Sequence, residues 1–161
     1  MTNDNYYRSI DLVIPEPVLQ HRMDLFRLRC VELGLTCTHQ RMVIYRALAA
    51  TDSHPTPESI YEQVRQEVPA ISLGTVYKNI HTFTAVGLLR EVNVLHDSLR
   101  LDANLEIHHH LVCVQCKTVI DVPEENVEPV QLRNPLPAGF RLERCSVEML
   151  GVCANCAARQ Q

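Results

Sequence analysis

The stretch HHHLVCVQCKTVIDV, residues 108–122, decides the architecture of the second half of this 161-residue chain. It contains one C-x2-C pair, and residues 117–152 separate it from a second pair with the same spacing. Two such pairs can enclose one zinc ion tetrahedrally. Four thiolates leave no open position, so we expect a structural zinc rather than a catalytic one. Its predicted ligands are Cys113, Cys116, Cys153 and Cys156.

Nitrogen and oxygen donors lie close in sequence to these cysteines. His108 and His110 are two residues apart, so in a strand they share one face, whereas His109 points to the other. Asp102 precedes this run and Asp121 follows it. A lone histidine would favour a structural role, but an H-x-H pair with two aspartates favours a second metal of harder character, Fe(II) or Mn(II).

Composition limits the function classes. Lys and Arg number 15 against 19 Asp and Glu, a net charge of −4, which argues against nonspecific coating of nucleic acid. No apolar run approaches the ~20 residues that cross a bilayer, and the N-terminus lacks the order of a secretion signal. We therefore expect a cytoplasmic protein without a membrane partner, whose seven cysteines are metal ligands and free thiols.

The first half predicts four helices. After a polar extension, 1–17, apolar residues recur at helical spacing from Val18 to Gly34. Thr38, Thr56 and Ser72 are good N-caps and predict the starts of three more helices. Extended runs at 88–95 and 99–102, joined by a turn at 96–98, predict a hairpin, so residues 18–103 are expected to form a winged helix-turn-helix domain.

The fourth helix has two different faces. Its apolar residues Val76, Ile80 and Phe83 project to one side. The opposite side carries Tyr77, Lys78 and His81, with no acidic residue from Val68 to Arg90. A solvated helix face is the simple alternative, but a helix in this position of a winged helix is expected to lie in a DNA major groove. Phosphate contacts are expected from a few residues, Arg41 and Lys78.

The second half, residues 104–161, is predicted to be a small α/β dimerisation domain. Strands are expected at 110–112, 118–122 and 140–150, with a short helix at 125–133. The whole chain is therefore of the α+β class, and zinc is expected to tie the last strand to the first.

Five motifs occur in order along the chain: H-P-T-P-E-S-I-Y (54–61), S-L-G-T-V-Y-K-N (72–79), R-L-D (100–102), H-x-H-x2-C-x2-C and the final C-x2-C. Together they resemble the ferric uptake regulator family of metal-dependent repressors. The resemblance implies a homodimer that binds a palindromic double-stranded DNA operator. It also implies a regulatory metal, held between a winged-helix domain and a dimerisation domain, that acts as corepressor.

The resemblance also assigns single residues. It adds His54 to the regulatory site, which becomes His54, Asp102, His108, His110 and Asp121. With aspartate at position 102, the chain resembles the peroxide-sensing branch of the family. In that branch, bound iron promotes oxidation of a ligand histidine that matches His54 or His108 here. Iron sensing, with glutamate common at that position, and zinc sensing, with cysteine, are the alternatives.

Other positions match less fully. Tyr77 and Lys78 match the family's base-reading and phosphate-contacting pair, whereas Thr36 stands where many relatives have a basic residue. A further metal site of some relatives would map onto His109, Glu128 and Cys145. The last replaces a histidine.

Two other classes fit less of the sequence. A zinc nucleobase deaminase needs a glutamate two residues after its ligand histidine, and neither His108 nor His110 has one. A zinc-ribbon module would explain the cysteines but leave His54, Asp102 and the helix face unused. We therefore expect a repressor that is not an enzyme and has no small-molecule substrate beyond metal ions and peroxide.

Overall fold

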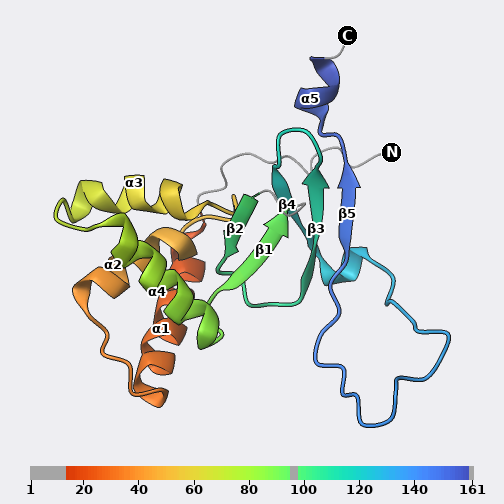
Figure 1. The fold of residues 1–161 in the computed structure, drawn as a ribbon, viewed down its shortest axis with the longest axis horizontal. Helices are drawn as coiled ribbons and strands as arrows, with labels where there is room; N and C mark the ends of the chain where they lie inside the picture. Colours follow the sequence, from red (N-terminus) through yellow and green to blue (C-terminus); the bar gives the residue numbers. More distant parts are fainter. Residues whose placement is uncertain (1–13, 95–97, 160–161) are drawn as a thin grey trace. The chain divides into compact units, whose positions relative to one another are not determined.

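A computed structural model describes residues 14–94 and 98–159, which form two compact units (Figure 1). Unit 1 is residues 1–105 and unit 2 is residues 106–161. Among the described residues, no helix is long and apolar enough to span a membrane.

Unit 1 contains the four predicted helices. They are α1 (Glu16–Glu32), α2 (His39–Ala49), α3 (Pro57–Glu67) and α4 (Leu73–Ala85). The predicted caps are confirmed, because the hydroxyls of Thr38, Thr56 and Ser72 each accept a hydrogen bond from the backbone N–H three residues on, at 3.3, 3.2 and 3.1 Å. Such bonds satisfy N–H groups that have no partner within the helix, and so fix where each helix begins.

A hairpin follows the helices. Strand β1 (Arg90–Val94) pairs antiparallel with β2 (Ser98–Asp102), in a register that sets Arg90 opposite Asp102. Two residues of the expected turn, His96 and Asp97, lie outside the described residues. The order of four helices and a hairpin agrees with the sequence prediction.

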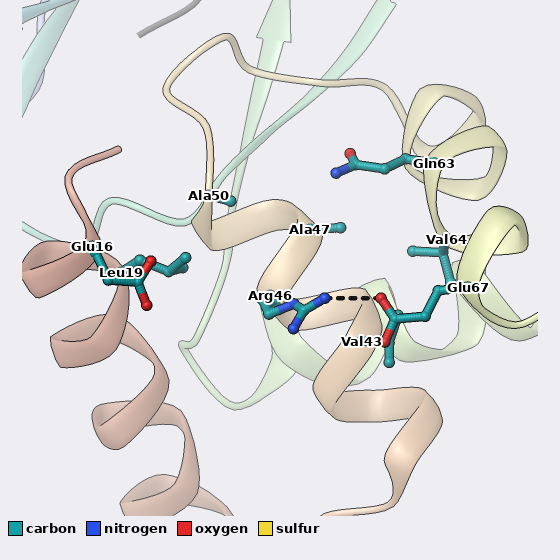
Figure 2. A pocket seen from close by; sticks show the side chains of 9 residues that line it. All are labelled: Glu16, Leu19, Val43, Arg46, Ala47, Ala50, Gln63, Val64 and Glu67. Atoms are coloured by element: carbon teal, nitrogen blue, oxygen red, sulfur yellow. Dashed lines mark hydrogen bonds and ion pairs between the residues drawn. The ribbon is translucent and has the colours of Figure 1, made fainter. Parts of the chain in front are cut away.

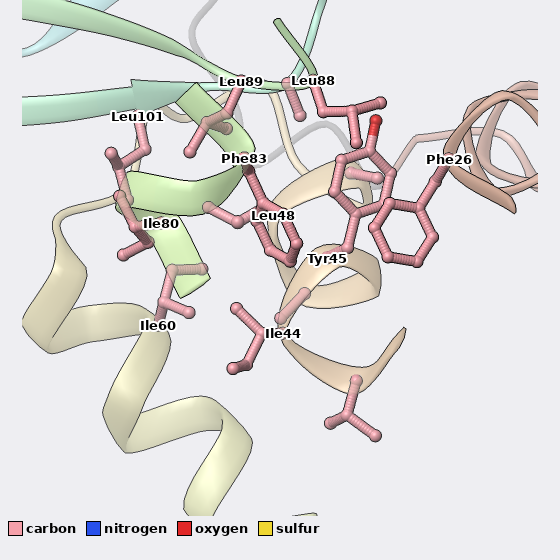
Figure 3. Packing of buried hydrophobic residues seen from close by; sticks show 14 of the residues in the cluster. Phe26, Ile44, Tyr45, Leu48, Ile60, Ile80, Phe83, Leu88, Leu89 and Leu101 are labelled. Carbon is pink, nitrogen blue, oxygen red and sulfur yellow. The ribbon is translucent and has the colours of Figure 1, made fainter. Parts of the chain in front are cut away.

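Three aromatic side chains form the centre of the unit 1 core (Figure 3). Phe26 stacks on Tyr45 with ring centroids 4.3 Å apart, and Phe83 meets both rings edge-on at 5.5 and 5.6 Å. These rings come from α1, α2 and α4, so one cluster holds three helices together. Val76 and Ile80, on the predicted inner face of α4, are also buried.

A shallow cavity of about 350 Å³ lies among α1, α2 and α3 (Figure 2). Its charged lining includes Arg46 of α2 and Glu67 of α3, which form an ion pair at 2.8 Å. Both side chains are about half exposed, so the pair contributes little, about 0–1 kcal/mol. The pair joins α2 to α3 at the surface.

Unit 2 is a small sheet followed by a short helix. Strand order is β4-β3-β5, with β3 (His108–Cys113) antiparallel to β4 (Val119–Pro123) and parallel to β5 (Glu148–Gly151). A 3-10 turn, η1 (Glu124–Asn126), follows β4, and α5 (Ala154–Ala158) follows β5. Since parallel strands point the same way, the ends of β3 and β5 meet at one edge of the sheet.

Two sequence predictions for unit 2 are wrong. The helix expected at 125–133 is limited to η1, and the strand expected at 140–150 exists only as β5. Pro129, Pro135 and Pro137 lie in the intervening segment, and each lacks the N–H that a helix or central strand needs. Phe140 and Leu142 are more than half exposed in this unit, so no burial favours an extended pairing there.

Candidate metal centres and nucleic-acid interface

Four cysteine sulfurs meet at the edge of the sheet where β3 and β5 end. Cys113 is the last residue of β3, and Cys116 follows in the turn to β4. Cys153 is the N-cap of α5 and Cys156 lies within that helix. Their four Sγ atoms all lie within 4.8 Å of one another. The structure thus brings together the whole predicted zinc quartet.

The electrostatics of this quartet suit a bound cation. The N–H of Cys153 donates to Sγ of Cys113 at 3.3 Å and, with other backbone donors, lowers the pKa of Cys113 to about 6. Hydrogen bonds to the Cys153 and Cys116 sulfurs raise the pKa of Cys156 to about 12. Without a cation, the four sulfurs cannot all ionise at such short separation. Four thiolates this close together fit a structural zinc ion, which takes four ligands and leaves no open coordination position.

A second set of donors lies on the β3–β4 ladder. His108 Nε2 is 3.0 Å from His110 Nε2, and Oδ1 of Asp121 is 3.6 Å from each. The register explains this, because His110 pairs with Asp121 across the two strands. Both imidazoles are buried and share one face, as the H-x-H spacing predicts.

The tautomer of His108 can be assigned from its other ring nitrogen. Nδ1 of His108 is 2.9 Å from the carbonyl oxygen of Glu106, which can only accept, so Nδ1 carries the proton. Nε2 of His108 then presents its lone pair toward His110 and Asp121. Orientation of a ligand imidazole by a carbonyl is common in metal sites. Two imidazoles and a carboxylate, with no sulfur, fit a regulatory metal of harder character than the zinc quartet.

The two remaining predicted ligands of the regulatory site belong to unit 1. His54 is buried and has a left-handed backbone, with φ of 51°. Asp102 ends β2, is also buried, and accepts a hydrogen bond from the N–H of Asn104 at 2.7 Å. The N–H of Leu101 donates to the Pro55 carbonyl at 3.0 Å, so the His54 segment lies beside the strand that carries Asp102.

His109 points away from the other two histidines, as expected. Its Nδ1 accepts a hydrogen bond from the N–H of Val147 at 3.1 Å, so the ring proton is on Nε2. His109, Glu128 and Cys145 line one cavity of about 640 Å³, with Glu124 and Glu125. Among the described residues these three do not form a cluster of ligand atoms within 4.8 Å of one another, and the further metal site stays a prediction.

The predicted DNA-reading residues differ in their exposure. Tyr77, Lys78 and His81 are exposed on the side of α4 opposite the core. Arg41 is half-buried and engaged within unit 1: its Nη1 donates to the Thr36 carbonyl at 2.6 Å and its Nε to Asn79 Oδ1 at 3.2 Å. Arg41 thus braces α2 against α4, and its contact with phosphate stays a prediction.

Glu58 has no role predicted from the sequence. This carboxylate, at the start of α3, accepts a hydrogen bond from the Tyr77 hydroxyl at 2.5 Å. The outward face of α4 therefore has an acidic neighbour, although its own sequence has none. No local pattern could have predicted this contact, because the two residues lie on different helices.

Comparison with known proteins agrees with the fold. A model of the ferric uptake regulator family matches residues 32–150, most of the chain. The chain belongs to this family. The members of the family to which it is similar are named as regulators and not as enzymes.

Three relatives illustrate the similarity. The peroxide-responsive repressor PerR of Staphylococcus aureus (strain Mu50 / ATCC 700699) is 28% identical over 138 residues, covering 86% of this chain and 93% of the relative. A zinc-bound manganese uptake regulator is 28% identical, with a TM-score of 0.62 and coverage of 84% and 98%. The Helicobacter pylori ferric uptake regulator, at 18% identity, shares the fold with a TM-score of 0.67 over 86% and 93%.

Proposed function

We propose that this chain is a metal-dependent transcriptional repressor that binds a palindromic DNA operator as a homodimer, with Fe(II) or Mn(II) as corepressor, and is inactivated by peroxide. The observation that carries the proposal is the sulfur-free cluster of His108, His110 and Asp121 in a member of the ferric uptake regulator family. A separate quartet of cysteines binds the structural zinc.

The regulatory site in this proposal is completed by His54 and Asp102. Both side chains are buried, and a backbone hydrogen bond ties their segments together. Asp102 ends β2 beside the His54 segment and offers carboxylate oxygens, donors that suit Mn(II) and Fe(II), which supports a role as ligand. A metal that takes ligands from both units binds only a conformation that brings them together. Metal binding would thereby stabilise one arrangement of the DNA-binding units.

The DNA-binding surface in this proposal is the outward face of α4, with Tyr77 and Lys78 as the base-reading and phosphate-contacting residues and β1–β2 as the wing. The exposure of both side chains supports this assignment. Two such faces in a homodimer would meet half-sites about one helical turn apart, ~34 Å. The partly exposed apolar residues Leu111 and Leu150 on the β3–β5 sheet support dimerisation through unit 2.

Peroxide sensing in this proposal rests on Asp102 and on the family resemblance. The regulatory cluster has no thiolate, so direct sensing there would depend on a bound metal, and ferrous iron would supply the redox chemistry. In the net reaction one peroxide oxygen would enter an imidazole C–H bond of His54 or His108, and the other would leave as water. An oxidised ring would be a poorer ligand, so the metal would be released and DNA binding lost.

Mass spectrometry of metal-loaded protein tests this mechanism. Protein loaded with iron and treated with equimolar peroxide should gain the mass of one oxygen atom on His54 or His108 and release a duplex that it bound before treatment. Manganese-loaded protein should stay unmodified and bound. Asp102→Glu is an informative variant, because it changes the carboxylate without removing it, and we expect slower oxidation.

Two outcomes would favour the alternatives. Equal peroxide resistance of the iron and manganese forms, with DNA binding that follows iron concentration, would identify an iron sensor. A requirement for zinc at the regulatory site would identify a zinc sensor. Absence of any metal-dependent DNA binding would overturn the repressor assignment itself.

A further inference from the structure

The Tyr77 hydroxyl donates its hydrogen bond to another side chain of unit 1, Glu58. It donates to Oε1 of Glu58 at 2.5 Å, from the exposed face of α4 to the first turn of α3. Thr56 caps that helix and Pro57 occupies its first position, so Glu58 is fixed by a well-defined helix start. The fold therefore holds this carboxylate next to Tyr77, the side chain proposed to read bases.

The protonation states of the pair are also fixed. Donation from Tyr77 lowers the pKa of Glu58, and the same hydrogen bond raises the pKa of Tyr77. The start of a helix further favours a negative charge at Glu58. At neutral pH the carboxylate is ionised and accepts only, so the phenol keeps its proton and directs it toward Glu58.

We propose that Glu58 is a specificity-determining positioning residue, which makes the Tyr77 hydroxyl a hydrogen-bond acceptor toward DNA. This inference rests on the proposed DNA-binding function. A hydroxyl whose only proton is committed elsewhere can bond a base that offers a donor, adenine N6 or cytosine N4 in the major groove. Guanine offers acceptors at N7 and O6, so Tyr77 disfavours it at the base pair it contacts.

Glu58 has a second effect through its charge. Its carboxylate lies beside the surface that phosphates would approach, so it weakens binding to every duplex alike. This general effect is separable from the choice of base. Glu62 provides the matched control, because it is exposed on the same helix and pairs with Arg65 at 3.1 Å rather than with Tyr77. Glu62→Gln removes the same charge and leaves the Tyr77 hydrogen bond intact.

Glu58→Gln is the decisive variant. Its side-chain amide can accept from or donate to the Tyr77 hydroxyl, so the hydroxyl is no longer restricted to accepting. The probes are a palindromic duplex selected from a random pool by manganese-loaded wild-type protein, and a series of single base-pair changes within it. We expect the preference against guanine at one position per half-site to fall by about fivefold or more in Glu58→Gln. It should be unchanged in Glu62→Gln, although both variants bind all duplexes more tightly.

Tyr77→Phe provides an independent test in the same DNA-binding assay. It lacks the hydroxyl, so it should lose the same preference, and adding Glu58→Gln to it should cause no further loss. Measurement of the Tyr77 pKa by nuclear magnetic resonance gives a readout without DNA, in which the value should fall in Glu58→Gln and not in Glu62→Gln. Both glutamates are exposed, so thermal unfolding of the three single variants is expected to match wild type.

The outcomes separate this inference from the proposed function. If wild-type protein selects no duplex, the DNA-binding function fails and this inference fails with it. If wild type selects a duplex, but Glu58→Gln keeps the wild-type base preference or the wild-type Tyr77 pKa, only the role of Glu58 is overturned.

Discussion

Removal of one zinc ligand by Cys153→Ser should unfold unit 2 and leave unit 1 folded. Cys153 contributes a sulfur to the quartet, and its N–H donates to Sγ of Cys113 at the edge of the sheet where β3 and β5 end. Among the described residues, the cysteine quartet is the only predicted metal site that links the β3–β4 turn to α5. The substitution removes one of its four ligands and therefore weakens this link.

The magnitude follows from the small apolar core of unit 2. Apart from two zinc ligands, the buried apolar side chains in the described part of this unit are Val112, Val119 and Val122. Their burial contributes about 6 kcal/mol, at roughly 2 kcal/mol each. Ordering the backbone of the 6 residues of β3 alone costs a similar amount, at about 1–2 kcal/mol per residue. Binding of a structural zinc, about 10–16 kcal/mol, is therefore needed to stabilise the fold.

The assay combines zinc content, gel filtration and amide hydrogen exchange. Cys153→Ser protein should lose its tightly held zinc, elute as a monomer, and lose exchange protection in β3 to β5, while α1 to α4 remain protected. Cys37→Ser is the control, because Cys37 lies in unit 1 and outside the quartet. Retention of one zinc per chain and of protected strands in Cys153→Ser would refute the reasoning.

Three further predictions concern unit 1. Phe26→Ala should lower the free energy of unfolding by about 3–5 kcal/mol in denaturant titration, since its ring is fully buried against Tyr45, whereas Leu28→Ala on the exposed side of the same helix should change it by less than about 0.5 kcal/mol. Thr56→Ala should cost about 1 kcal/mol in the same assay, because it removes the N-cap of α3; a neutral result would contradict the cap. Lys78→Ala should weaken binding to all duplexes and reduce the salt slope by about one, and an unchanged slope would exclude a phosphate contact.

The helices of unit 1 could be predicted because their starts depend on local chemistry. A hydroxyl at Thr38, Thr56 or Ser72 reaches an N–H only three residues away, so the sequence contains both partners. The inner face of α4 follows from the 3.6-residue period in the same way. The metal donors on β3 are likewise local, since alternation along a strand sets His108 and His110 on one face.

Long-range contacts could not be predicted in this way. The approach of Glu58 to Tyr77 depends on how α3 packs on α4, which no spacing encodes. No strand forms at 140–147. Apolar residues such as Phe140 favour a strand there, whereas the nearby prolines disfavour one, and the hydrophobic pattern alone does not show which preference is stronger. The resemblance to a family suggests His54 as a candidate ligand, which the residue pattern by itself does not connect to the distant histidines.

The parallel pairing of β3 with β5 also has a consequence for how the protein matures in the cell. The register sets Cys113 beside Gly151, so two halves of one zinc site are made at different times during translation. Unit 1 has mostly local helical contacts and can fold while the rest is still being synthesised. Unit 2 must wait until Cys153 and Cys156 have left the ribosome. Until then Cys113 and Cys116 form half a site, and supply of zinc at that moment would limit the yield of folded protein.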